Sequence, residues 1–204
     1  RHDCRLGKTR RTGVEVHANS RIGRVTLSGG YTFLDATYQS TETVDGSSNS
    51  SNDLAAAGAS GLEGTIQIAP GDRIPLVPQH MVKAFADIRA TAKLSVDVSL
   101  AGFSGSPARG NENDLHAPEG AFYLGPGSTP AYATLNLGAR YQVTPWVQLF
   151  CNVNNLFNQH YYTAAQLGPT AFSANGDFIA RPFPAVGGDF PVQAFRSENS
   201  FGFQ

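Results

Sequence analysis

The side chains with the widest chemical potential in this 204-residue sequence are five histidines and two cysteines, and they are scattered. They are His2, His17, His80, His116, His160, Cys4 and Cys151. None of the histidines has the i, i+4 partner of a helical zinc motif, and the cysteines form no C-x-x-C pair. We therefore predict no metal site and no cofactor. A disulfide between the cysteines is one interpretation, and two unpaired thiols is the favoured one.

Ser104 is the one residue that looks like a catalytic nucleophile, because it lies in the sequence Gly-Phe-Ser-Gly-Ser at 102–106. That stretch lacks the G-x-S-x-G spacing and the strand-to-helix setting of a nucleophile elbow, so we interpret it as a strand end. Asp45, Asp53 and Glu63 do not follow the calcium-loop pattern, which favours a solvated loop over a calcium site. We find no catalytic constellation and predict that the protein is not an enzyme.

The composition limits the remaining classes of function. Charged residues are 15% of the chain, below the roughly 25% of an average soluble domain. The net charge of -1 gives no reason to expect nucleic acid as a partner. Hydrophobic residues are 41%, but no run approaches the about 20 apolar residues of a membrane helix, so a membrane helix is excluded and a membrane strand is not. The chain starts at Arg1 without a signal-like segment, and we expect more sequence upstream.

Most of the chain alternates apolar and polar residues with a period of two, which predicts strands. Val82, Ala84, Ala86 and Ile88, for example, alternate with a set that includes Lys83. The segments are about 12–20, 25–33, 82–90, 94–100, 133–142 and 147–154, with a seventh at about 195–203. Several reach ten residues, whereas globular strands average about 5–6 and tilted membrane strands need roughly 9–11. Their length favours a membrane.

The connections between these segments alternate strictly in length. Short links fall at 19–24, 91–93 and 143–146, and long polar stretches at about 40–79, 106–130 and 159–190. Outer-membrane β-barrels pair short periplasmic turns with long extracellular loops in this way. Because seven strands are too few and odd in number, the rest of the wall must come from missing sequence.

In a barrel, the apolar set of each strand would face lipid and the polar set would face the lumen or a plug. The polar set includes Glu15, His17, Lys83, Asp87, Arg89, Asp97 and Arg140. Trp146 and Tyr141 at the short turns, with Tyr161 and Tyr162 at the other end, suit interfacial girdles. The competing interpretation is a soluble β-sandwich, whose strands also alternate.

Three stretches resemble the barrels of TonB-dependent outer-membrane receptors and together cover most of residues 9–165. The first resembles the family's "GVE" strand at Gly13, Val14 and Glu15, followed by a tyrosine-bearing partner at 27–36. The second, at 74–80, resembles a strand entry marked by two prolines. The third, at 153–162, resembles the "N-L-F" signature. The matching residues of the second and third are Pro75, Pro78, Asn154, Asn155, Leu156, Phe157 and Tyr161.

The resemblance implies an all-β fold, with residues 1–204 as the C-terminal portion of a 22-stranded antiparallel barrel and the plug absent. It implies a receptor in the outer membrane of a Gram-negative bacterium that takes up a ferric siderophore or similar metal chelate. Its partners would be outer-membrane lipid, the small-molecule ligand and, through a missing N-terminal region, the TonB complex. The sequence departs from the family at 195–204, where Ser197 and Asn199 share a face with phenylalanines, which puts barrel closure in doubt.

Loop aromatics and arginine suit an anionic or metal-chelate ligand, although packing between loops is the alternative role for each. The candidates are Phe122, Tyr123, Phe172, Phe178 and Arg181. Two further functions stay open. One is another outer-membrane barrel, such as a passive porin or an adhesin anchor, and the other is a soluble β-rich binding module.

Overall fold

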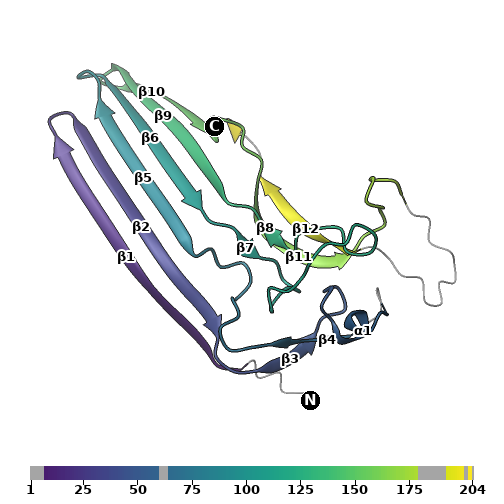
Figure 1. Cartoon of the computed structure of the whole chain (residues 1–204). Helices are drawn as coiled ribbons and strands as arrows, with labels where there is room; N and C mark the ends of the chain where they lie inside the picture. The colour runs from purple at the N-terminus through teal and green to yellow at the C-terminus, as the bar shows by residue number, and fades with distance from the viewer. Residues whose placement is uncertain (1–6, 60–63, 179–191, 200–201, 204) are drawn as a thin grey trace.

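The structure, a computed structural model, describes residues 7–59, 64–178, 192–199 and 202–203, the last two ranges through their backbone only. Its main feature is a bowed antiparallel sheet in which neighbours along the chain are neighbours in space (Figure 1). The strands in spatial order are β1 (Thr9–Ile22), β2 (Val25–Tyr38), β5 (His80–Arg89), β6 (Leu94–Phe103), β9 (Tyr132–Thr144), β10 (Val147–Asn154) and β13 (Gly202–Phe203). The predicted all-β, antiparallel, seven-stranded wall is confirmed, and within the described residues it is not closed.

Most strands are longer than the alternation alone predicts. The first was expected at about 12–20, but β1 pairs with β2 without interruption from Thr9 opposite Tyr38 to Ile22 opposite Val25. The two strands are joined through Gly23, whose φ of +59 suits a tight hairpin turn and disfavours residues with a side chain. At roughly 3.4 Å per residue, fourteen residues extend more than far enough to cross a tilted bilayer path.

The register gathers apolar side chains into rows that cross several strands. One central row consists of Ala18, Gly29, Ala84, Leu100 and Leu135, each directly opposite the next. The adjacent row, one residue along every strand, belongs to the other face. It consists of Asn19, Ser28, Phe85, Ser99 and Asn136. The period-two pattern of the sequence thus becomes one apolar and one mainly polar face.

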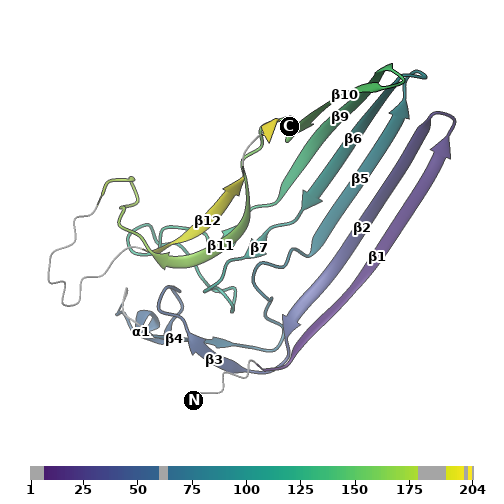
Figure 2. The same cartoon turned by 180° about the vertical axis from the view of Figure 1, so that it is seen from behind.

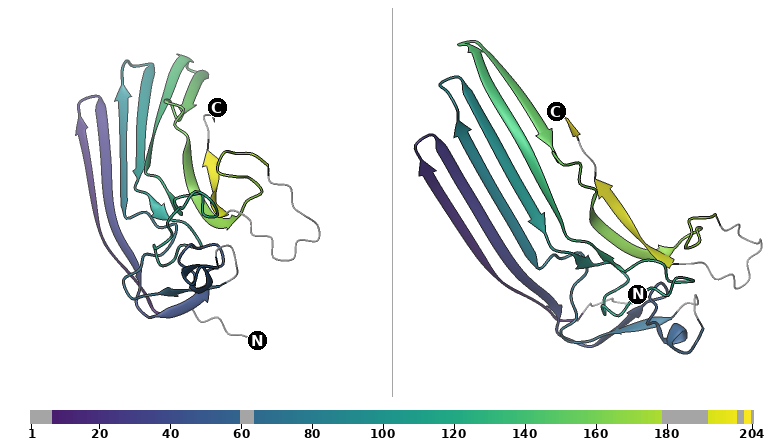
Figure 3. Two further views of the ribbon diagram at one scale, coloured as in Figure 1. Left: turned by 45° about the vertical axis from the view of Figure 1, so that its right-hand side comes forward. Right: turned by 45° about the horizontal axis from the view of Figure 1, so that its top comes forward.

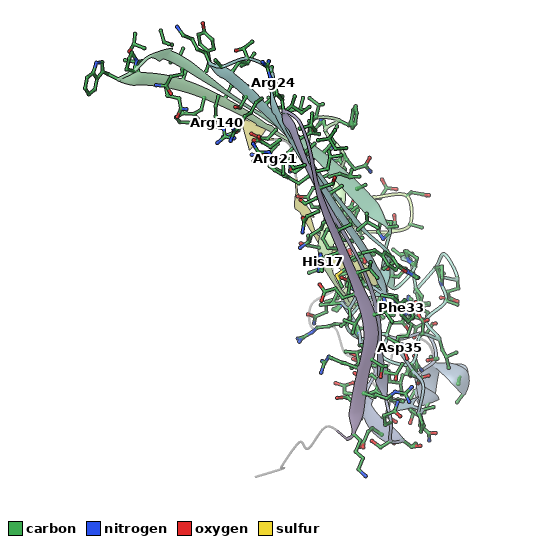
Figure 4. The ribbon with its side chains drawn as sticks, turned by 90° about the vertical axis from the view of Figure 1, so that its left-hand side faces the viewer. His17, Arg21, Arg24, Phe33, Asp35 and Arg140 are labelled. Carbon is green, nitrogen blue, oxygen red and sulfur yellow. The ribbon has the colours of Figure 1, made fainter. Side chains whose placement is uncertain are left out.

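No second layer covers the apolar face in the part of the chain that the structure describes. Every residue of β1 is exposed, and Val14, Val16 and Leu149 keep 60%, 56% and 58% of their surface accessible. Figure 4 shows His17, Arg21 and Arg140 on the concave side of the sheet, with Phe33 on the opposite side. A soluble sandwich would bury the apolar face under a second sheet, so this arrangement instead suits a barrel wall.

The two ends of the sheet are unlike each other, as Figures 1 and 2 show. One end carries the short turns at 23–24, 90–93 and 145–146, and the other carries the long connections. The long connections contain short elements that the sequence pattern did not predict. These are β3 (Glu42–Asp45), α1 (Asp53–Ala56), β4 (Thr65–Ile68), β7 (Ser106–Pro107), β8 (Ser128–Thr129), β11 (Tyr161–Pro169) and β12 (Val192–Asn199). No helix among the described residues has the length and apolarity needed to cross a membrane.

The segment at about 195–203, predicted as a seventh strand, does form strand, but only its last residues belong to the main sheet. β12 pairs with β11, and only β13 pairs with β10, through Asn154 opposite Gly202 and Val153 opposite Phe203. The physical reason is the bend after β10, where Asn155 takes a φ of 52 and turns the chain away from the main sheet into β11. Figure 3 shows β12 lying beside β11, away from the long strands of the main sheet. The predicted side-chain faces at 195–203 lie outside the described side chains.

If the convex face meets lipid, Leu100→Arg will destabilise the protein far more than Ala101→Arg. Leu100 is in the central apolar row, whereas Ala101 lies in the row of His17 and Lys83 on the concave face. An arginine facing the bilayer midplane costs roughly 2–4 kcal/mol, and one facing an aqueous lumen costs little. Denaturant unfolding of both variants of the complete protein in lipid vesicles measures the difference, and equal losses would contradict a lipid-facing surface.

Candidate functional site

The long connections pack into a cluster that holds the buried residues of the described chain. Apart from the last residues of β2, the described strands of the main sheet contribute almost none. The apolar ones are Ala36, Tyr38, Ile66, Ile68, Ala108, Tyr123, Ala165 and Leu167. A small core of this kind holds the loops in a defined shape, and such preorganised loops are suited to recognising a ligand.

Asparagines join the first long connection to the second. Asn49 donates from Nδ2 to the carbonyl of Gly110 at 2.8 Å, and Asn113 donates to Oγ of Ser51 at 2.8 Å. Asn52 accepts from the backbone N–H of Ala55 as the N-cap of α1. Asn49 and Asn52 are fully buried, and their amides satisfy backbone groups that would otherwise be unpaired.

His116 lies at the centre of this contact and has a structural role. Its Nδ1 accepts from the N–H of Ser50 at 3.1 Å, and its Nε2 donates to the carbonyl of Gly125 at 3.1 Å. Tyr123 packs edge-on against the ring at 5.6 Å between centroids. Burial lowers the pKa of His116, opposed by the hydrogen bond to Gly125. The imidazole is therefore neutral at pH 7, which its role as acceptor from Ser50 requires.

An aromatic stack connects the third long connection to the sheet. Tyr161 stacks on Tyr132 with ring centroids 4.5 Å apart, and Phe103 packs against Tyr132 at 5.1 Å. Tyr161 is one of the motif residues, whereas the sequence reasoning missed Phe103 and Tyr132. Their positions at the ends of β6 and β9, directly opposite each other, were the available signal.

The concave face carries the charged residues that the alternation assigned to it. Arg140 donates to Asp87 at 2.9 Å across the intervening strand β6, and Glu15 accepts from His17 at 2.8 Å. The carboxylate of Asp97 lies over Gly138, where a Cβ would come within 2.4 Å of it. Phe85 is a residue that the sequence reasoning missed, since it is apolar, 40% exposed and in a polar row.

Several motif residues have structural roles at close approaches and turns. A Cβ on Gly13 would lie 2.3 Å from the carbonyl oxygen of Phe33, so the β1–β2 pairing leaves no room for a side chain there. Leu76, between Pro75 and Pro78, has a φ of 62 and donates its N–H to the carbonyl of Pro107 at 2.9 Å. The proline segment thus joins the first long connection to the second.

Asn155 directly follows β10 and organises the turn there. Its side chain donates to the carbonyl of Gln159 at 2.9 Å and accepts from the N–H of the same residue at 3.0 Å. It is 4% exposed, whereas Leu156 and Phe157 of the same motif are 36% and 75% exposed. Asn154 pairs with Gly202. Asparagine tolerates a left-handed backbone better than most residues, which accounts for its use here.

The candidate ligand residues occupy different environments. Tyr123 is 2% exposed and its hydroxyl accepts from Asn52 at 3.3 Å, and Phe122 packs against the same small core. Phe172 and Phe178 pack edge to face at 6.1 Å and are 48% and 70% exposed. Arg181 lies outside the described residues.

The remaining reactive side chains show no shared site in the described ranges. No group of three His, Cys, Asp or Glu side chains there has metal-binding geometry, and Cys151 is an exposed free thiol. Cys4 and Glu63 lie outside the described residues. Ser104 follows directly after β6 and accepts two backbone N–H groups, from Gln79 and His80, at 3.0 and 3.1 Å. These bonds link the ends of neighbouring strands.

Comparison with known proteins gives one family and several related structures. The family described as "TonB dependent receptor-like, beta-barrel" matches residues 4–156. The siderophore receptor PiuA of Acinetobacter baumannii is similar, with a TM-score of 0.59 and 18% identity over 96% of this chain and 21% of that one. The ferric-catecholate import receptor Fiu of E. coli K12 is similar with a TM-score of 0.51 and 18% identity, over 96% of this chain and 20% of that one. The ferric preacinetobactin receptor BauA of Acinetobacter baumannii is similar with a TM-score of 0.51 and 23% identity, over 76% of this chain and 19% of that one.

No curated protein matches the chain. The chain spans about a fifth of the length of each of these solved receptors. Because the identities are below 25%, these structural matches show a shared fold alone, and the wall described above is that fold.

We predict that Asn155→Ala will lower the free energy of unfolding by about 2–4 kcal/mol, from backbone strain and two lost hydrogen bonds. Asn155→Gly relieves the strain and should lose about half as much. The control is Asn158→Ala, because Asn158 has a φ of 47 but is exposed, and it should cost only the strain. Chemical denaturation measures all three, and equal losses for the two alanine variants would rule out a role for the Asn155 side chain.

We also predict that acid loosens the loop cluster through His116. Its folded pKa is below the unfolded value of 6.5, so the unfolded state takes up the proton first. The stability of the cluster is therefore fully present above pH 6.5 and falls as the pH drops below it. Proteolysis of the loops over a pH series measures this change. His116→Gln should flatten the profile and His17→Gln should not, whereas an unchanged profile in His116→Gln would contradict the assignment.

Proposed function

The chain belongs to the family of TonB-dependent receptors, and from this membership we propose that it is part of the barrel of an outer-membrane importer of ferric siderophores or similar metal chelates. The observation that carries the proposal is the two-faced wall with its packed loops gathered at one end. The names of the similar structures, which are receptors for siderophores, add support.

The proposed location is the outer membrane of a Gram-negative bacterium, with the apolar convex face against lipid. Tyr141 and Trp146, 45% and 93% exposed near the short turns, suit the periplasmic interface. The long connections at about 40–79, 106–130 and 159–190 would then face the outside of the cell. This orientation places the loop cluster where a scarce extracellular ligand first arrives.

We propose that the rest of the barrel, the plug and the contact with the TonB complex come from sequence beyond these 204 residues. Among the described residues, the outer edge of β1 and much of that of β10 have no partner strand, and hydrocarbon does not tolerate unpaired backbone groups. The charged concave face suits a watery interior or a polar plug. Residues 1–204 would then be the C-terminal portion of a 22-stranded barrel.

Among the candidate ligand residues, Phe172 and Phe178 are the best placed to contact a ligand, since both are exposed at the third long connection. Phe122 is half-buried at the edge of the loop core. Tyr123 would contribute by fixing the loop shape, because its side chain is buried. Arg181 stays in the proposal as a residue of the same connection.

The proposal predicts that cells lacking this gene lose uptake of a radioactive ferric chelate and that uptake in the parent strain requires TonB. A passive porin would keep admitting the chelate in a TonB-deficient strain, and a soluble module would fractionate without detergent. Either result would overturn the proposal.

The paired substitution Phe172→Ala and Phe178→Ala should weaken chelate binding about tenfold, from the loss of two contact rings. Leu115→Ala, another exposed loop position, serves as the control.

A further inference from the structure

A cavity of about 480 Å³ lies where the three long connections meet the end of β2. Tyr38 lines it from β2, and Ile68 and Ile74 form part of an apolar wall from the first connection. Arg109 and Glu112 come from the second connection. The volume is that of a small-molecule pocket, and no residue highlighted by the sequence motifs lines it except Pro75.

Tyr38 is the feature of the cavity that points to a ligand. Its side chain is 7% exposed, yet its hydroxyl forms no hydrogen bond with the described residues, although the phenol lines the cavity. Its backbone is fixed, because the N–H donates to the carbonyl of Asp72 and the carbonyl accepts from Gly71, both at 2.9 Å. Among the described side chains the buried polar atom without a partner is Nη2 of Arg73, so the Tyr38 hydroxyl is open to the cavity. A phenol there can donate a hydrogen bond to a bound molecule.

The charged groups around the phenol are unevenly balanced. Glu112, Arg109 and Asp72 act electrostatically on Tyr38, and Asp45 also lines the cavity. Glu112 and Asp45 each use one carboxylate oxygen to accept a backbone N–H, from Gly110 at 3.0 Å and from Ser47 at 3.1 Å. Each therefore retains a second oxygen for a ligand.

The surrounding loops extend this negative field. Their described residues carry eight acidic side chains against two arginines, an excess of six negative charges. The acidic residues are Glu42, Asp45, Asp53, Asp72, Glu112, Asp114, Glu119 and Asp177, and the arginines are Arg73 and Arg109. At the adjoining end of the sheet Lys8, Arg10 and Arg11 oppose Asp35, so the excess around the cavity falls to four. A field of one sign concentrates ligands of the opposite charge and repels those of the same charge.

The rim of the cavity is held in place by backbone hydrogen bonds between connections. The N–H of Arg109 donates to the carbonyl of Ala165 at 2.9 Å, and the N–H of Leu167 donates to the carbonyl of Arg109 at 2.8 Å. These bonds attach the second connection to β11, which also contributes Gln166 to the lining. A rim fixed before binding loses little entropy when a ligand arrives.

We infer that this cavity is a ligand subsite that accepts a neutral or cationic chelate and rejects a polyanionic one. The inference rests on the proposed function and names the charge class of its ligand. Tyr38 hydrogen-bonds the ligand, Glu112 and Asp45 bind a cationic group on it, and the isoleucines contact its apolar part. This reverses the expectation from the sequence that loop arginine and aromatics select an anionic ligand.

The test uses the complete protein in detergent and three ferric probes of similar size. They are a trihydroxamate with a pendant ammonium group, its neutral acetylated form and a trianionic tris-catecholate. We expect the cationic probe to bind most tightly, with an affinity that falls as salt is added. Tightest binding of the trianionic probe would overturn the inference.

Substitutions locate the effect in the cavity. Tyr38→Phe removes only the hydroxyl and should weaken the neutral probe about tenfold, whereas the control Tyr141→Phe on the convex face should change nothing. Asp45→Asn combined with Glu112→Gln should weaken the cationic probe about tenfold and strengthen the trianionic one. Asp114→Asn, in the same loop but outside the lining, should have a much smaller effect.

The two proposals fail in different ways. Uptake of a chelate that responds to none of the cavity substitutions would overturn the subsite and leave the importer standing. Absence of uptake for all three probes would count against the importer itself. Each variant is run on a denaturing gel without heating, where a folded barrel migrates differently from the heated, unfolded chain. A variant that keeps the folded band has formed its barrel, so a lost affinity cannot be ascribed to misfolding.

Discussion

Backbone pairing is the constraint on which the rest of this structure depends. In hydrocarbon each N–H and C=O must find a partner, and long antiparallel strands satisfy this need only when they continue in register from neighbour to neighbour. Here the register continues across β1, β2, β5, β6 and β9, and it places every residue of those strands on one of two faces. The chemistry of each face follows from this ladder, as does the gathering of the loops at one end.

The sheet could be predicted from the sequence because its information is local. Val82 and Lys83 are adjacent in the chain and lie on opposite faces, so alternation alone assigns them. Strand length, the strict alternation of short and long links, and the antiparallel order followed in the same way. Phe85 shows the limit of the pattern, because nothing within β5 explains an apolar side chain in a polar row.

The loop cluster could not be predicted in the same way, because its contacts join residues far apart in sequence. Asn49 contacts Gly110 and Ser50 contacts His116, and neither pairing leaves a periodic trace. Tyr123 was predicted as a candidate ligand contact, and nothing in the sequence indicated that its side chain is buried. The split of the last strand has a similar origin, since it depends on the left-handed turn at Asn155 rather than on the alternation of 195–203. Tyr38 drew no notice because a single tyrosine at a strand end is ordinary until its neighbours are known.

Alternate residues of each strand determine the two faces of the wall. A substitution alters one face. The loss of a single residue inside β5, however, would exchange the two faces from that point to the next turn and would bring Lys83 or Asp87 to the apolar face. Such strands therefore tolerate substitutions far better than insertions or deletions. The long connections carry no such phase, so insertions and deletions during evolution should accumulate in them and spare the wall.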